Sequence, residues 1–156
     1  MLTAALDVAQ KARLESLVVY VDGLDELASL EKLPFTGPLK VILITRSEEA
    51  YQAAAACTEK VVRLPEVNLT RTGQIKMAAM LSFSKRLLLP GERFVYLTGL
   101  SRGKLDTMMV MQVGAEYEMF QTVDQPPITE HIRRAVFERV LNLALELAAE
   151  GREGKS

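Results

Sequence analysis

Residues 40–54 read KVILITRSEEAYQAA and decide the fold, because they place a strand directly ahead of a helix. The first six residues are almost continuously apolar, which is typical of a strand buried on both faces of a parallel sheet. Ser47 is a good helix N-cap, and Glu48 and Glu49 suit the positive end of a helix dipole. An alanine series at 53–56 continues the helical pattern. The stretch therefore predicts one strand–helix unit of an α/β domain.

Four further apolar runs predict strands on either side of this unit. They are 17–21 (LVVYV), 60–64 (KVVRL), 93–98 (RFVYLT) and 107–113 (TMMVMQV). The first and third are apolar enough to be buried on both faces, whereas KVVRL is weaker and is expected nearer an edge. The methionine-rich run is predicted to be a buried strand.

Helical patterns separate these runs. Residues 2–14 carry an apolar face with a 3.6-residue period, and Thr70 or Thr72 opens a second helix that Pro90 and Gly91 close. Consecutive prolines at 126 and 127 predict a boundary, with an α/β domain at 1–125 and a helix and linker at 126–156. The terminal helical pattern has an apolar face wide enough for two packing partners, so we expect another domain or subunit to cover part of it.

Composition narrows the classes of function. The 156 residues suit one domain, and 19 Lys plus Arg against 20 Asp plus Glu give a net charge of -1, which argues against a nucleic-acid or membrane-surface binder. The single cysteine, Cys57, is expected to pack as a small buried hydrophobe in a cytoplasmic protein. His131 is the only histidine, so no histidine-based metal cluster or relay can form within one chain. We expect no catalytic residue, no metal and no cofactor.

The terminal GREGKS resembles the end of a phosphate loop, but its glycines have the wrong spacing and it follows a helix. It is better explained as a helix stop and linker.

The best binding site is predicted at the carboxyl edge of the sheet, where open α/β domains place their ligands. Loop 98–104 (TGLSRGK) combines two glycines, two hydroxyls and two cations, and could hold an anion through backbone amides and Arg102. The loop also fits a structural connection into an edge strand, which is the commoner role of such loops. The candidate ligand-binding residues are Asp22, Gly23, Thr45, Arg46, Thr98, Gly99, Ser101, Arg102, Gly103 and Lys104.

Three acids follow the first strand, at Asp22, Asp25 and Glu26. They could hold a metal, but capping of a short helix at 24–30 by Asp22 explains them more simply.

From residue 4 to 113 the chain resembles the C-terminal domain of pyruvate kinase. The resemblance rests on VILITRSEEAYQAA (41–54), GQIKMAAMLSFSKRLLLPGERF (73–94) and FVYLTGLSRGKLDTMMVMQVG (94–114). It implies a three-layer α/β/α domain with a five-stranded mixed sheet of order 3-2-1-4-5, its last strand antiparallel, and an allosteric sugar-phosphate site. This chain has VDGLDE (21–26) where that family has a Thr/Ser-rich phosphate loop, and acids there would repel a phosphate dianion, so fructose bisphosphate is not the expected ligand.

A second resemblance covers the C-terminal end. VFERVLNLALELAAEGREGKS (136–156) is similar to the helix and turn that lead into the catalytic domain of diadenylate cyclases. LTRTGQIK (69–76) and LDTMMVMQVGAEYEM (105–119) are similar to the pyruvate-kinase-like domain at the N-terminus of those proteins. The Asp-Gly-Ala and Arg-His-Arg motifs of the catalytic domain are absent from this sequence.

The two resemblances imply a non-catalytic regulatory, sensing or oligomerising domain of a cyclase that makes cyclic di-AMP, ending at Ser156 where the catalytic domain would begin. Its expected partners are the downstream catalytic domain, a second copy of the chain and a small phosphorylated ligand. The alternative is a free-standing module that binds a small anion or phosphometabolite.

Overall fold

The computed structural model describes most of the first 114 residues and a few helical positions beyond them. The described residues are 1–24, 30, 33–65, 69–99, 105–114, 136, 139–140, 143–144 and 147. The elements in chain order are α1 (Leu2–Lys11), β1 (Ser16–Tyr20), the 3-10 turn η1 (Val21–Gly23), β2 (Lys40–Thr45), α2 (Glu48–Cys57), β3 (Val61–Arg63), α3 (Arg71–Ser84), β4 (Arg93–Thr98) and β5 (Thr107–Gln112). The predicted alternation of strands and helices is confirmed.

The five strands form one mixed sheet of order β3-β2-β1-β4-β5. The first four are mutually parallel, and β5 runs antiparallel to β4. This is the architecture that the resemblance to pyruvate kinase implied. The short β3 lies at one edge, as the weaker pattern of residues 60–64 predicted.

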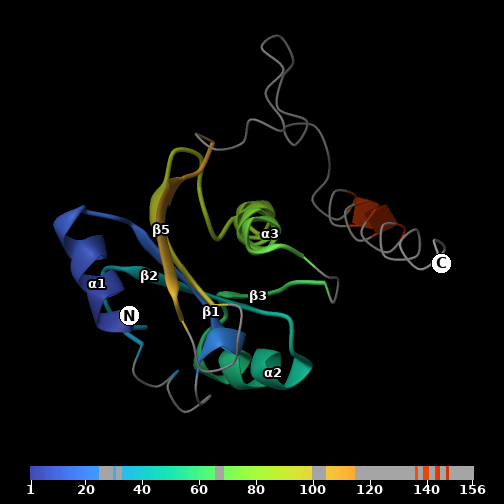
Figure 1. Ribbon diagram of the computed structural model, residues 1–156, viewed down its shortest axis with the longest axis horizontal. Helices are drawn as coiled ribbons and strands as arrows, with labels where there is room; N and C mark the ends of the chain where they lie inside the picture. Colours follow the sequence, from blue (N-terminus) through green and yellow to red (C-terminus); the bar gives the residue numbers. More distant parts are fainter. Residues whose placement is uncertain are drawn as a thin grey trace, which may run out of the picture.

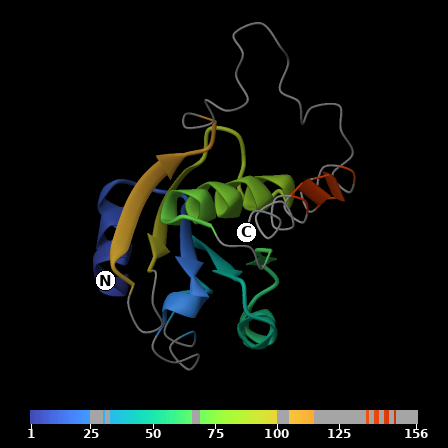
Figure 2. The same ribbon diagram turned by 45° about the vertical axis from the view of Figure 1, so that its right-hand side comes forward.

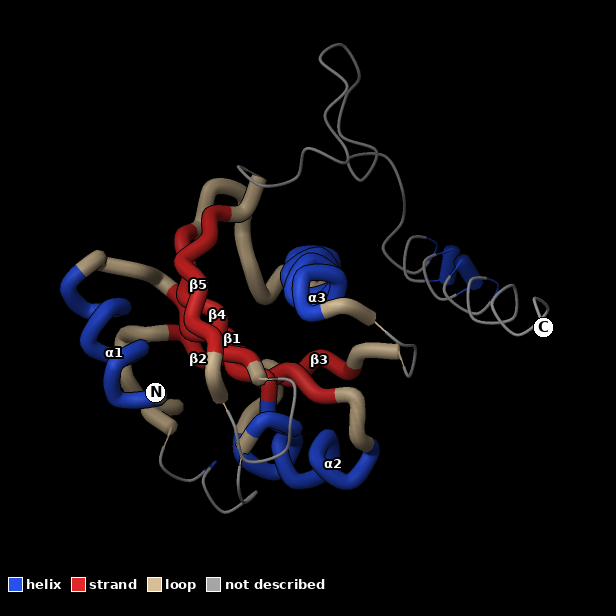
Figure 3. Tube along the Cα trace, in the orientation of Figure 1, coloured by secondary structure: helices blue, strands red, loops and turns tan. Residues whose placement is uncertain are grey.

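Helices cover both faces of the sheet (Figures 1 and 3), with α1 and α2 on one face and α3 on the other. Odd-numbered residues of the central strands, such as Leu17 and Leu43, pack toward α1 and α2. Even-numbered residues, such as Val18 and Ile42, pack toward α3, which lies across the sheet in Figure 2. The central strands are buried on both faces, which explains their continuous apolar sequence.

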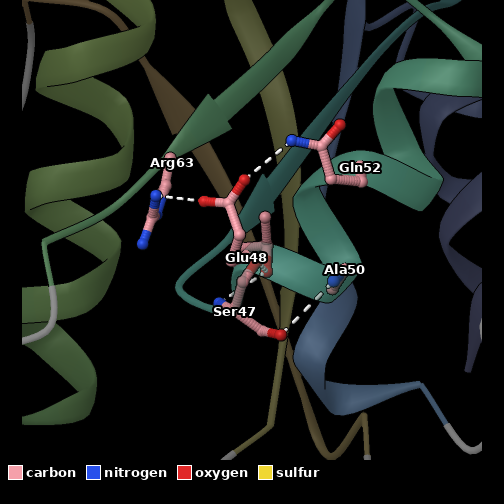
Figure 4. A network of polar contacts seen from close by, with 6 residues as sticks. Ser47, Glu48, Ala50, Gln52 and Arg63 are labelled. Atoms are coloured by element: carbon pink, nitrogen blue, oxygen red, sulfur yellow. Dashed lines mark hydrogen bonds and ion pairs between the residues drawn. The ribbon is translucent and has the colours of Figure 1, made fainter.

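The helix starts follow the expected capping chemistry. The Ser47 hydroxyl accepts a hydrogen bond from the Ala50 amide at 3.3 Å and begins α2 (Figure 4). The neighbouring Glu48 carboxylate accepts one hydrogen bond from Gln52 and another from Arg63 at the end of β3. The second bond connects α2 to the sheet. Thr70 caps α3 by accepting from the Gly73 amide at 3.1 Å.

The third helix ends earlier than the sequence predicted. It stops at Ser84, and Arg86 in a left-handed conformation (φ 56°) turns the chain away from the helix. Gly91, also with positive φ, then serves the turn before β4 instead of closing the helix.

Two predictions of burial are wrong. The methionine-rich strand β5 lies at the edge of the sheet and, among the described strands, pairs with β4 alone, so Met109 and Val110 remain 36% and 45% exposed. Cys57, the last residue of α2, is exposed, whereas Ala50 and Ala54 are the buried residues of that helix.

The end of the chain is described in part. Residues 136, 139–140, 143–144 and 147 are helical, in agreement with the predicted terminal helix. The predicted boundary at 125, His131 and GREGKS lie outside the described residues. Within the described part, no helix is long and apolar enough to cross a membrane.

Candidate functional site

The carboxyl ends of β1, β2 and β4 meet at one edge of the sheet, at the switch point between β1 and β4 where open α/β sheets bind ligands. Gly23 and Gly99 lie against each other here. A Cβ added to Gly23 would come within 3.5 Å of the Gly99 amide nitrogen and 3.0 Å of the Leu105 side chain. Gly23 therefore leaves room for the Leu105 side chain, which follows β4, to pack closely against the chain after β1.

Asp22 joins the end of β1 to the end of β2. One carboxylate oxygen accepts from the Thr45 hydroxyl, and the other accepts from the Arg46 amide at 2.9 Å. The Thr45 hydroxyl in turn accepts from the Ser47 amide at 3.0 Å. The helix predicted at 24–30 lies mostly outside the described residues; within them the Asp22 carboxylate spans two strands, because the end of β2 presents donors to it. Donors on both oxygens offset the negative charge that the sequence placed at this edge.

Tyr20 lies beside Asp22 on the α3 face. Burial raises the pKa of the Tyr20 phenol to about 12, the Asp22 carboxylate adds to that rise, and the neighbouring Arg46 guanidinium opposes it. The hydroxyl is therefore protonated at physiological pH. Sequence reasoning missed Tyr20, and the available signal was its position one residue before the end of the strand predicted at 17–21.

The base of the candidate loop is tied to α3. The Thr98 hydroxyl donates to the Gln74 side chain at 2.9 Å, with both residues buried. After the loop, Asp106 pairs with Arg71 at 3.0 Å, and Arg71 also donates to the Thr107 hydroxyl. Sequence reasoning missed Gln74 and Arg71, because nothing in a helical pattern tells which polar residue of the first turn meets a distant strand.

The structure therefore brings six predicted residues to one edge. They are Asp22, Gly23, Thr45, Arg46, Thr98 and Gly99. Ser101, Arg102, Gly103 and Lys104 lie outside the described residues, as do Asp25 and Glu26. Within the described ranges, no group of three histidine, cysteine or acidic residues could hold a metal ion.

Comparison with known proteins supports this architecture. The family model described as "Probable sensor domain DacZ_P" matches residues 1–122. The fold is similar to a pyruvate kinase from Cryptosporidium parvum, with a TM-score of 0.51 and 12% identity. That match covers 70% of this chain and 21% of the kinase, so the chain spans about a fifth of that enzyme. No curated protein matches the sequence.

Proposed function

The chain belongs to the family of probable sensor domains DacZ_P, and on that premise we propose that it is the non-catalytic sensing domain of a diadenylate cyclase. In this proposal residues 1–125 form the sensing domain, and residues 126–156 connect it to a catalytic domain that makes cyclic di-AMP in the cytoplasm. The resemblance of residues 136–156 to the cyclase linker supports the connection.

The observation that carries the proposal is the convergence of three strand ends on a polar edge. Asp22, Thr45 and Thr98 are joined there by hydrogen bonds to the chain around them, and Gly23 meets Gly99. Such an edge holds small ligands in open α/β sheets. The signal we propose is a small phosphorylated metabolite, with Ser101, Arg102, Gly103 and Lys104 of the adjoining loop supplying amides and cations.

Ligand-dependent thermal stability tests this proposal. A nucleotide or sugar phosphate that binds the folded chain raises its melting temperature by an amount that grows with the ratio of ligand concentration to Kd. We expect the shift to disappear in Arg102→Ala and to persist in the control Lys76→Ala, an exposed cation on α3. If no metabolite in a broad panel raises the melting temperature, the sensing site is wrong.

Cyclase activity tests the connection. In the protein that carries both domains, the metabolite that stabilises the sensing domain is expected to change the rate of cyclic di-AMP synthesis. An unchanged rate at saturating metabolite would contradict a regulatory role.

Exposed apolar side chains favour a second role, oligomerisation. Val136, Val140, Leu143 and Leu147 are 50%, 59%, 44% and 66% exposed and recur at spacings of four, three and four residues. This spacing places them on one side of a helix, as in the seam of a coiled coil. We expect analytical ultracentrifugation to find a homo-oligomer that Leu143→Lys dissociates, whereas a monomer at all concentrations would refute this role.

A further inference from the structure

The two edges of the sheet differ in their protection against pairing with another chain. At one edge, β3 has only three residues, includes Arg63 and follows Lys60. Short length and charged side chains are usual protections of an edge strand. At the other edge lies β5, the orange strand of Figure 2, with six residues (TMMVMQ) and neither a charge nor a proline among them. The β5 edge therefore lacks the protection that the β3 edge has.

The outer side of β5 carries backbone groups without a partner strand. All six residues pair one for one with β4, and just beyond them the Val113 amide donates to the Glu92 carbonyl at 2.9 Å. Backbone direction alternates along an antiparallel strand. Since Val113 faces β4, the amides and carbonyls of Met108, Val110 and Gln112 face away from it. Among the described strands, none lies on that side of β5.

Exposed apolar side chains gather at the same strand. Met109 and Val110 are exposed, and successive side chains of a strand point to opposite faces of the sheet. Leu89 is 54% exposed and lies in the turn before β4, where the Gly91 amide donates to the Val113 carbonyl just after β5. An apolar strand with an open edge is a typical site for the addition of another strand.

A second copy of β5 matches this edge in register. In an antiparallel pair related by a two-fold axis at Val110, Val110 lies opposite Val110 of the second copy. Met108 then lies opposite Gln112 of the second copy, so all three outward-facing residues of each strand are hydrogen-bonded. A two-fold contact uses the same surface on both copies, and this strand is complementary to itself.

The charges around β5 also permit pairing with itself. Like charges directly opposite each other destabilise a strand pair, and β5 contains no charge. The nearest charge is that of Asp106, which in this register lies opposite Gly114 of the second copy. Its carboxylate already pairs with Arg71 at 3.0 Å. A second copy therefore brings no unfavourable charge to the contact.

We propose that two copies of this chain pair through their β5 strands, so that their sheets join into one continuous sheet. The inference adds a second surface to the oligomerising role proposed above, and it does not depend on the terminal helix. If both contacts form, the chain assembles beyond a dimer, and Leu143→Lys dissociates that assembly to dimers held by β5.

Sedimentation of the 156-residue chain carrying Leu143→Lys isolates the β5 contact, and we expect a dimer. In that background, Val110→Lys and Val110→Glu each place two like charges at the two-fold axis and are expected to weaken dimerisation about tenfold or more. The control Ala55→Lys, on the exposed side of α2, is expected to remain a dimer. An equimolar mixture of the two Val110 variants is expected to dimerise again, because opposite charges then face each other.

Amide hydrogen exchange tests the same contact without a change in β5. In the Leu143→Lys chain, the amides of Met108, Val110 and Gln112 are expected to be protected at high protein concentration and to exchange rapidly after dilution below the Kd. The amides of Met109 and Met111 face β4 and are expected to stay protected at both concentrations.

The proposal is overturned if the Leu143→Lys chain is a monomer at every concentration, or if its three outward-facing amides exchange rapidly at every concentration. It is also overturned if folded Val110→Lys and Val110→Glu chains do not associate when mixed. A wild type that is a dimer of the same mass as the Leu143→Lys chain would refute the terminal-helix contact and support pairing through β5.

Discussion

Replacing Glu92 by glutamine is expected to destabilise the domain strongly, although the residue lies at the amino edge of the sheet, away from the candidate site. Its carboxylate is 6% exposed and accepts from Ser16, from Lys40 at 2.8 Å and from the Leu89 amide at 2.8 Å. The glutamine side chain removes the negative charge that faces Lys40. It also replaces one acceptor oxygen by an NH2 group, which is itself a donor and faces the donors that surround this side chain. Hydrogen bonds to charged groups contribute about 1.5–3 kcal/mol, and breaking a buried pair costs about 3–5 kcal/mol.

We take a loss of about 3 kcal/mol, at the lower end of that range, because Lys40 is 26% exposed and can turn to solvent. For a chain of 156 residues this corresponds to a fall in melting temperature of about 6–12 °C. Urea denaturation followed by circular dichroism measures the free energy of unfolding directly. The exposed Glu59→Gln serves as the control and is expected to change it by less than about 0.5 kcal/mol.

The pH dependence gives a second readout of the same contact. Burial alone would raise the pKa of Glu92, but hydrogen bonds from Lys40, Ser16 and the Leu89 amide outweigh it and lower the pKa below its ordinary value. A depressed carboxylate pKa stabilises the fold above the unfolded pKa, about 4.3, and this stabilisation is lost as the pH falls through the folded pKa. The difference in free energy of unfolding between the wild type and Glu92→Gln is therefore expected to become smaller below about pH 4. A variant within about 1 kcal/mol of wild type at pH 7 would show that the reasoning about this carboxylate is wrong.

Three further changes test the site and the helix starts. Asp22→Asn is expected to cost about 1.5–3 kcal/mol in urea denaturation, because it weakens the charged bonds to Thr45 and to the β2 terminus; a loss below about 0.5 kcal/mol would contradict that role. Gly23→Val is expected to cost about 1–3 kcal/mol by forcing Leu105 aside, with amide shifts spreading into β5, and an unchanged spectrum would refute the close approach. Ser47→Ala is expected to lower stability by about 1 kcal/mol, which Ser47→Asp should restore if the lost cap is the cause.

Much of the fold could be predicted because burial on both faces demands continuous apolar sequence. The bounds predicted for β2 and β4 agree with the structure, and the Ser47 cap lies where the sequence placed it. The edge position of β3 followed from its weaker apolar run, KVVRL at 60–64. Apolar composition did not distinguish a buried strand from an edge strand, so β5 was wrongly expected to be buried.

The candidate site could be predicted only in part. Asp22, Thr45 and Thr98 could be assigned to the site because they lie at or just after the predicted ends of strands, and parallel strands bring their carboxyl ends to one edge of the sheet. The partners of these residues were not predictable: Gln74 meets Thr98 across 24 positions, and the fold alone decides which helix residue faces which strand.

The sequence by itself determined the α/β class, the capped helix starts and the edge at which polar residues gather, since periodicity and capping are local properties of the chain. The tertiary structure decided what those polar residues do. In the fold, the Asp22 carboxylate accepts a hydrogen bond from the end of β2. The Nε–H of Arg46 and the hydroxyl of Tyr96 are buried without an acceptor among the described residues. The physical reason is that hydrogen-bond partners are set by the register of neighbouring strands and by helix packing, which join residues far apart in the sequence.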